Sequence, residues 1–124
     1  MKITHVTTRA VVTPADTTLL FNNRKPTPDT LDFVTLELGT DEGLVGVGVT
    51  FFGAALNNAL KTAVDDMARL LIGDDPTQVE KIAAKLRAVA GSAGPGGIFT
   101  LALSAIDMAC WDLKGKAAEK SLCD

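Results

Sequence analysis

Residues 98–119 restrict the possible fold most strongly, because they predict a helix that is apolar on nearly every face. Other elements must cover such a helix on all sides, so we expect it at the centre of its domain. The segment nevertheless contains two aspartates, Asp107 and Asp112. These carboxylates could be a catalytic pair, metal ligands or structural acceptors, and the choice decides whether this chain carries out chemistry or supports it.

The spacing of the two aspartates argues against a shared chemical role. Five helical steps rotate a side chain by about 140°, so the carboxylates diverge and cannot share a proton or hold one metal ion together. Asp112 precedes Lys116 by four residues, which is a favourable ion-pair spacing. Asp107 needs a partner from another element if it is buried. We interpret both as structural hydrogen-bond acceptors.

The first part of the chain, residues 1–54, reads as a three-stranded antiparallel meander. The expected strands are residues 3–13, 33–38 and 44–50, with a tight Gly/Asp turn at 39–43. Gly46 and Gly48 lie two apart on one face of the third strand, and the missing side chains predict a close approach by another element.

A long connection, residues 14–32, joins the first two strands and holds three of the five prolines. Connections of this length in compact domains are usually functional or disordered. Leu19 and Phe21 lie near its centre, so we expect it to contact something outside itself, as a lid does.

The second part, residues 55–124, reads as helices. The expected helices are residues 56–71, 76–89 and 98–119. Asp75 is the expected N-cap of the second, with Pro76 at its first position. Residues 91–97 form a glycine-rich break without a phosphate-binding motif. The whole chain is therefore expected to be one α+β domain, a β-meander followed by a helical bundle.

Composition excludes several classes of protein. A net charge of -3 over 124 residues gives no basic footprint for nucleic acid or anionic membrane. The N-terminus lacks the apolar core of a signal peptide, so we expect a cytoplasmic location. Cys110 and Cys123 form no disulfide framework or zinc spacing, and His5, the single histidine, has no ligand or base partner at a useful spacing. We expect no catalytic residue and no metal ligand in this chain.

The helical segment "AIDMACWDLKGK" resembles a motif of the enolase superfamily, in its mandelate racemase and muconate lactonizing branch. That motif has the form A-x-D-x-A-x-W-D-x-x-G-K, and the matching residues here are Ala105, Asp107, Ala109, Trp111, Asp112, Gly115 and Lys116. "GLVGVGVTFFG" is similar to the family's third strand, and "LLIGDDPTQVEKI" to its link between the first two helices. The resemblance covers essentially the whole chain and identifies it as an N-terminal capping domain, with Asp107, Trp111 and Asp112 in structural roles.

The resemblance implies that the chemistry resides in a C-terminal (β/α)-barrel, which typically has about 250 residues and is absent from this chain. In the family, the barrel supplies the catalytic bases and the ligands of Mg²⁺, which stabilises an enediolate after a proton is removed next to a carboxylate. Lys114 and Lys116 copy the spacing of a catalytic K-x-K motif, but that motif belongs on a barrel strand and these lie on a helix. This chain alone is expected to be inactive.

What the family implies for this domain is substrate specificity. Its first loop and the turn after its third strand close over the barrel mouth, and the corresponding residues here are Leu19, Phe21, Asn22, Asn23, Arg24, Lys25, Phe51 and Phe52. The polar residues of this set favour an acid-sugar dehydratase, whereas the phenylalanines favour a racemase or cycloisomerase. The expected partners are the barrel, a small carboxylate substrate and further copies in a homo-oligomer. A freestanding, non-catalytic binding module is the alternative from another class.

Overall fold

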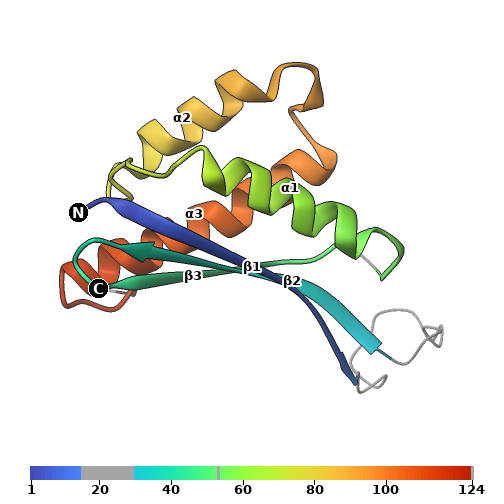
Figure 1. The fold of residues 1–124 in the computed structure, drawn as a ribbon, viewed down its shortest axis with the longest axis horizontal. Helices are drawn as coiled ribbons and strands as arrows, with labels where there is room; N and C mark the ends of the chain where they lie inside the picture. Colours follow the sequence, from blue (N-terminus) through green and yellow to red (C-terminus); the bar gives the residue numbers. More distant parts are fainter. Residues whose placement is uncertain (15–29, 53, 124) are drawn as a thin grey trace.

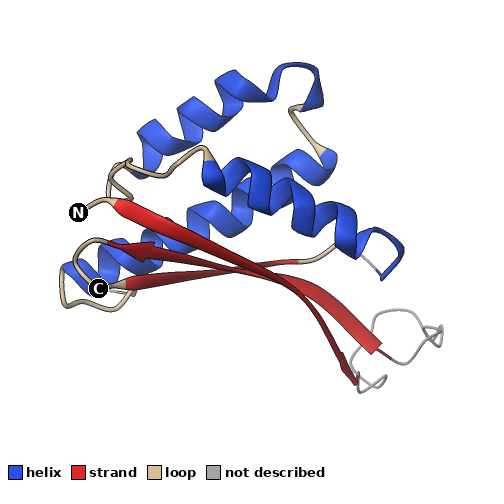
Figure 2. Ribbon diagram, in the orientation of Figure 1, coloured by secondary structure: helices blue, strands red, loops and turns tan. Residues whose placement is uncertain are grey.

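The computed structural model describes residues 1–14, 30–52 and 54–123. It contains three antiparallel strands followed by three α-helices, which confirms the predicted α+β fold (Figures 1 and 2). The strands, in the sheet order β1-β2-β3, are β1 (Ile3–Pro14), β2 (Thr30–Thr40) and β3 (Val45–Thr50). The helices are α1 (Asn57–Arg69), α2 (Val79–Ala90) and α3 (Gly97–Ala117), with short 3-10 turns η2 (Ala54–Leu56) and η3 (Gly91–Ala93).

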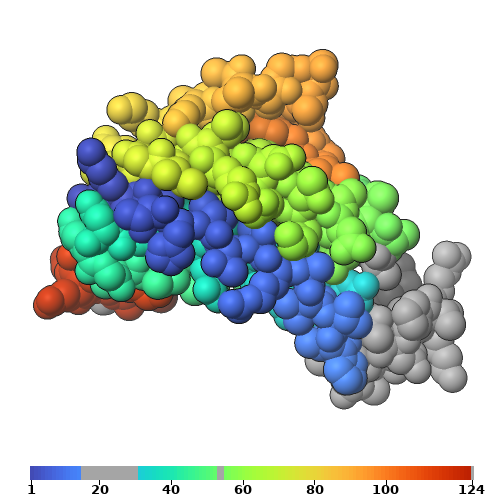
Figure 3. Space-filling model, in the orientation of Figure 1, coloured from blue at the N-terminus to red at the C-terminus, as the bar shows by residue number. Residues whose placement is uncertain are grey.

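The sheet buries one face against the helices. Val34, Leu36 and Leu38 alternate along β2 and are fully buried, because strand side chains point to opposite faces with a period of two. On β3, the residues that lie beside Leu38 and Leu36 on this helix-facing side of the sheet are Gly46 and Gly48, and both are buried. The space-filling view shows the helices as a layer over the strands (Figure 3).

Strands β1 and β2 are longer than the sequence predicted. Their antiparallel register continues to the pair formed by Pro14 and Thr30, because each residue added to one strand finds a backbone partner on the other. The expected connection 14–32 is therefore wrong at its ends, and residues 15–29 lie outside the described residues. The paired ends project beyond the helices, on the side of the molecule away from both termini (Figure 1).

Helix α3 has the central position that its apolar surface predicted. Its residues Ala102, Ala105 and Ala109 are fully buried, and it packs against β3, α1 and α2. The approach to β3 is very close: a side-chain carbon placed on Gly48 would lie 1.9 Å from the carbonyl oxygen of Ala105. At Gly46 the same test gives 2.2 Å to the carbonyl oxygen of Ala109, so the predicted close contact at both glycines is confirmed.

The predicted start of the second helix is wrong. Helix α2 begins at Val79, and Asp75 caps no helix. The Asp75 carboxylate instead accepts the backbone N–H of Thr77 at 3.0 Å and its hydroxyl at 2.8 Å. A short aspartate side chain can satisfy the backbone two residues ahead in a local turn, and here that turn takes the place of a first helical turn.

Within residues 1–14, 30–52 and 54–123, no helix has both the length and the apolar character that a membrane span requires.

Candidate functional site

The C-terminal end of β3 leads to two exposed aromatic residues. Phe51 is 66% exposed and Phe52 is 40% exposed. They follow Thr50, which pairs with Val34 of β2, so they lie where β3 stops and β2 continues alone with β1. Exposed Leu31 on β2 and Leu56 before α1 add apolar surface near this end of the sheet. Large apolar side chains that gather at one exposed place mark a site of interaction, so this end of the sheet is a candidate contact surface.

Two buried acceptors lie close to this end without a hydrogen-bond donor among the described residues. The side chain of Asn57, the first residue of α1, donates its amide N–H to the carbonyl oxygen of Phe33 at 3.5 Å, and its Oδ1 has no donor. One carboxylate oxygen of Asp32 is buried in the same way. A buried acceptor without a donor is destabilising, and such groups are rare away from functional sites. Sequence reasoning missed both residues. For Asn57 the available signal was a polar residue at the start of an apolar helical stripe, and Asp32 offered no comparable signal.

The specificity residues predicted in the first connection, 19–25, lie outside the described residues. Phe51 and Phe52 are the described members of the predicted set, and the assignment of substrate specificity to both groups stays a prediction.

Asp112 joins α3 to the free edge of β3. Its Oδ2 accepts the backbone N–H of Val47 at 2.9 Å and the ammonium group of Lys116 at 2.6 Å. The same ammonium group donates to the carbonyl oxygen of Val45 at 2.7 Å. An edge strand exposes backbone groups that need hydrogen-bond partners, and Asp112 and Lys116 are the partners of two such groups on β3. The predicted ion pair between Asp112 and Lys116 is therefore confirmed. Both residues also hold α3 against β3 through their hydrogen bonds to the strand backbone.

Asp107 differs from Asp112. It is half-buried, and it has no hydrogen bond or ion pair with the residues that the structure describes. The expectation that it accepts a hydrogen bond within the domain is therefore not met by these residues.

Cys110, one helical turn after Asp107, is fully buried, and burial raises the pKa of that thiol to about 12, with the Asp107 charge adding to the effect. Trp111 points outward, with the Lys114 ammonium 4.5 Å from its ring centre.

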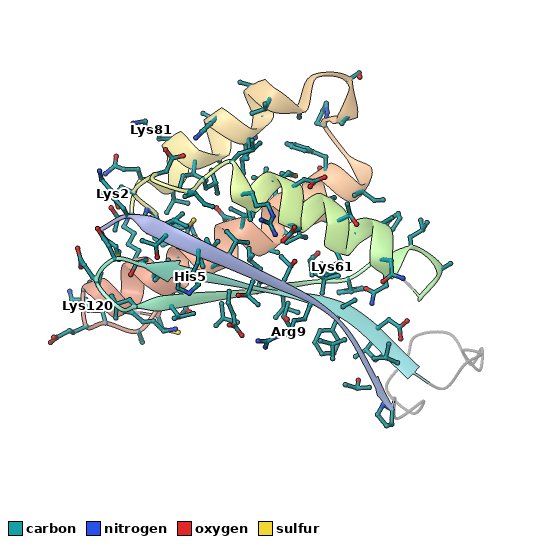
Figure 4. All side chains as sticks on the ribbon, in the orientation of Figure 1. Lys2, His5, Arg9, Lys61, Lys81 and Lys120 are labelled. Atoms are coloured by element: carbon teal, nitrogen blue, oxygen red, sulfur yellow. The ribbon has the colours of Figure 1, made fainter. Side chains whose placement is uncertain are left out.

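Arg9 lies on the outer face of the sheet, but it is not a free cation that could bind an anionic substrate. Its guanidinium pairs with Glu37 across the β1–β2 ladder at 3.2 Å. His5 lies over Gly39 and is exposed (Figure 4). Both residues are labelled on β1 in Figure 4, with Arg9 on the side of the sheet away from the helices.

The described residues do not fit a magnesium site. No group of three or more His, Cys, Asp or Glu side chains comes close enough together in residues 1–14, 30–52 and 54–123 to hold a metal ion. Mg²⁺ prefers several carboxylate and water oxygens in octahedral geometry, which this part of the chain does not assemble.

Comparisons with known proteins agree with this architecture. The chain is 43% identical over 93 residues to a D-galactonate dehydratase family member of Musicola paradisiaca, covering 73% of this chain and 22% of that protein. It is 39% identical over 116 residues to the D-galactarolactone cycloisomerase of Agrobacterium fabrum, covering 94% and 29%. The crystal structure of L-talarate dehydratase from Polaromonas sp. JS666, complexed with Mg and L-glucarate, superposes with a TM-score of 0.78 at 29% identity, covering 94% of this chain and 30% of that one.

The chain thus spans less than a third of the length of these relatives. The sequence profile described as mandelate racemase / muconate lactonizing enzyme, N-terminal domain, matches residues 4–124. A meander of three strands, a central third helix and a match over nearly the entire sequence lead to one conclusion: this chain belongs to the mandelate racemase/muconate lactonizing enzyme family, as its N-terminal domain.

Proposed function

We propose that this chain is the capping and specificity domain of a Mg²⁺-dependent acid-sugar dehydratase that removes the proton next to a carboxylate. The observation that carries the proposal is the similarity to a D-galactonate dehydratase family member and to L-talarate dehydratase. The catalytic bases and the ligands of Mg²⁺ belong, in this proposal, to a C-terminal barrel in the same polypeptide. A cytoplasmic location and assembly into a homo-oligomer are further parts of the proposal.

The physical contribution of this domain is to close the site. Phe51 and Phe52 present aromatic surface at the end of β3, next to the buried acceptors of Asn57 and Asp32. Placed over the barrel mouth, the rings would exclude water from the reacting carboxylate and wall the distal part of the substrate. Exclusion of water strengthens every electrostatic interaction inside the site.

Cycloisomerisation is the second candidate reaction. Its support is the similarity to D-galactarolactone cycloisomerase, which extends over 94% of this chain, more than the dehydratase family member covers. The two reactions differ in what happens after proton removal: a dehydratase expels a hydroxyl group from the neighbouring carbon, whereas a cycloisomerase rearranges a ring without loss of water.

The test is to express the longer protein that contains this chain and to incubate it with Mg²⁺ and a panel of sugar acids and sugar lactones. Mass spectrometry separates the outcomes, because dehydration removes one water and cycloisomerisation leaves the mass unchanged. Turnover that depends on Mg²⁺ and removes water supports the dehydratase. The absence of turnover on every sugar acid, sugar lactone and aromatic hydroxy acid, with the substrates still binding, would favour the non-catalytic binding module.

The role of the domain is tested with Phe52→Ala in the same protein. We expect kcat/KM to fall by about tenfold if the ring walls the substrate site, since one tenfold step equals about 1.4 kcal/mol of transition-state stabilisation. Val89→Ala, on an exposed apolar side chain of α2, is the matched control and should leave kcat/KM unchanged. Equal kcat/KM values for the two variants would show that Phe52 does not line the substrate site.

A further inference from the structure

The start of α1 carries a buried asparagine whose side-chain amide points to the sheet. Asn57 is 5% exposed, and its Nδ2 donates to the carbonyl oxygen of Phe33 on β2 at 3.5 Å. An asparagine near the start of a helix ordinarily caps that helix with its side chain. Here the residue at the cap position is Leu56, which makes no side-chain cap hydrogen bond. The Asn57 amide instead reaches a strand residue 24 positions earlier in the sequence.

This contact lies beside the last pair of the β2–β3 ladder. Val34, the next residue of β2, pairs with Thr50, and β3 ends there. Phe51 and Phe52 follow directly, and we call these two residues the aromatic pair. The chain that carries the aromatic pair therefore leaves the sheet opposite Val34 and is joined to it again, through Asn57, at the adjacent residue of the same strand.

Stability alone does not account for an amide at this position. The Oδ1 of Asn57 is buried without a donor among the described residues, and so is one carboxylate oxygen of Asp32, two residues before Val34 on the same face of β2. A leucine has nearly the volume of an asparagine and would bury no such acceptor, so it should be no less stable there. What the amide adds is direction, because a hydrogen bond fixes one geometry whereas apolar contacts tolerate small shifts.

We propose that Asn57 is a positioning residue: its amide fixes the start of α1 to β2 and thereby sets where the aromatic pair stands over the substrate. The inference rests on the proposed function, because that function makes the aromatic pair a wall of the substrate site. Asn57 acts through the rings and does not itself contact the substrate, since its side chain is buried.

The remainder of α1 does not depend on this contact. Leu60 and Val64 are fully buried, and the Thr8 hydroxyl of β1 donates to the Asp65 carboxylate at 2.9 Å. Loss of the Asn57 amide should therefore loosen the first turn of α1 and the chain before it, and leave the rest of the helix in place. A change in the position of the aromatic pair is then measurable apart from unfolding.

The variant that tests this is Asn57→Leu, made in the longer protein that contains this chain. Its matched control is Asn58→Leu, the same substitution at the next residue, where the side chain is exposed. Asn57→Ser replaces it if the leucine variant does not fold, because the smaller side chain fits and its hydroxyl is one bond shorter than the amide. We expect both leucine variants to keep the unfolding temperature of the unmodified protein. If neither Asn57 variant folds, the amide is a structural requirement and the proposal is overturned.

The first measurement is steady-state turnover of the sugar acid or sugar lactone that the protein accepts. Loss of one neutral hydrogen bond shifts a local equilibrium about fivefold, so KM should rise about fivefold in Asn57→Leu while kcat changes less than about twofold. Asn58→Leu should leave both constants unchanged. When Phe52→Ala is already present, Asn57→Leu should not raise KM further, because the amide acts through the ring.

Equal KM values for Asn57→Leu and Asn58→Leu would overturn the proposal. A rise in KM of the same size with and without Phe52→Ala would also overturn it, since Asn57 would then act independently of the ring. A fall in kcat alone would assign Asn57 a structural role and contradict the positioning role.

The second measurement needs no turnover, so it separates this inference from the proposed function. Hydroxyl-radical labelling of the same proteins without substrate reports the exposure of the aromatic pair, and Phe99, which is buried, is the internal reference. We expect labelling of the aromatic pair to rise about twofold or more in Asn57→Leu and to stay unchanged in Asn58→Leu. Unchanged labelling of both rings in Asn57→Leu would overturn the inference even in an active enzyme. A protein that turns over no sugar acid or lactone but shows the rise would refute the proposed function and leave the placement of the aromatic pair by Asn57 standing.

Discussion

The carboxylate of Asp112 accepts the backbone N–H of Val47 at 2.9 Å, across 65 residues of sequence. This contact fixes the C-terminal half of α3 to the free edge of β3, and Lys116 completes it by donating to both Asp112 and the carbonyl oxygen of Val45. The two glycines of β3 make the contact possible, because they let the helix backbone come close enough for a short side chain to reach the strand.

Asp112→Ala should destabilise the domain by about 1–3 kcal/mol, because it leaves the Val47 N–H and the Lys116 ammonium without their acceptor. The measurement is urea unfolding followed by circular dichroism. Asp112→Asn should cost less, since an amide oxygen can still accept from Val47. Asp66→Ala, at an exposed position of α1, is the control and should change stability by no more than about 0.5 kcal/mol. A loss no larger than that of the control would show that the edge contact is unimportant.

Gly48→Ala should be more damaging than its small size suggests. The added carbon would lie 1.9 Å from the Ala105 carbonyl oxygen, which belongs to the helix backbone and cannot rotate away. Forcing α3 off the strand should cost about 1–3 kcal/mol or more. Val49→Ala, on the outward face of the same strand, is the comparison and should cost clearly less. The unfolding midpoints of the two variants decide the matter, and equal midpoints would argue against the close approach.

Asp107→Ala should leave the stability of this chain within about 0.5 kcal/mol of the original, because Asp107 has no partner among the described residues. A hydrogen bond within the domain, as the sequence led us to expect for Asp107, would instead make the substitution cost about 1–3 kcal/mol. Thermal unfolding of the 124-residue chain distinguishes the two values.

Acid should destabilise the domain through Asp65 and Asp75. The Arg69 guanidinium and the Thr8 hydroxyl hold the pKa of Asp65 below 3.8, and the Thr77 backbone N–H does the same for the pKa of Asp75. When the pH falls below 3.8, the unfolded chain takes up protons first, so stability is present above that value and is lost as the pH falls through the folded pKa values. Urea midpoints measured from pH 5 down to about pH 2 should show this loss, with a smaller slope in Asp65→Asn. An identical slope in that variant would remove Asp65 from the explanation.

The two cysteines should differ sharply in reactivity. Cys110 is fully buried with its pKa raised to about 12, so it stays a protonated thiol at neutral pH, whereas Cys123 is exposed. Iodoacetamide should modify Cys123 in the folded chain and reach Cys110 only after unfolding, as peptide mass spectrometry would show. Rapid modification of Cys110 in the folded protein would mean that α3 separates readily from its neighbours.

The sequence by itself determined the central position of α3, because a helix that is apolar all round is stable only when other elements surround it. It also determined the β2–β3 hairpin and the close approach at Gly46 and Gly48, since strand alternation places both glycines on the buried face. Spacing alone predicted the ion pair of Asp112 with Lys116, because positions four apart on a helix are neighbours.

Only the tertiary structure decided which groups outside the helix meet these side chains. Periodicity gives the face on which a residue lies but not the element opposite it, so the Val47 N–H as the partner of Asp112 could not be predicted, nor could the outward position of Trp111. The start of α2 depended on whether the Asp75 carboxylate caps a helix or accepts hydrogen bonds in a local turn. An aspartate can do either, so the local sequence does not decide between them. The apolar surface around Trp111 exists only because β3, α3 and the chain after α3 place Val47, Met108 and Leu122 side by side.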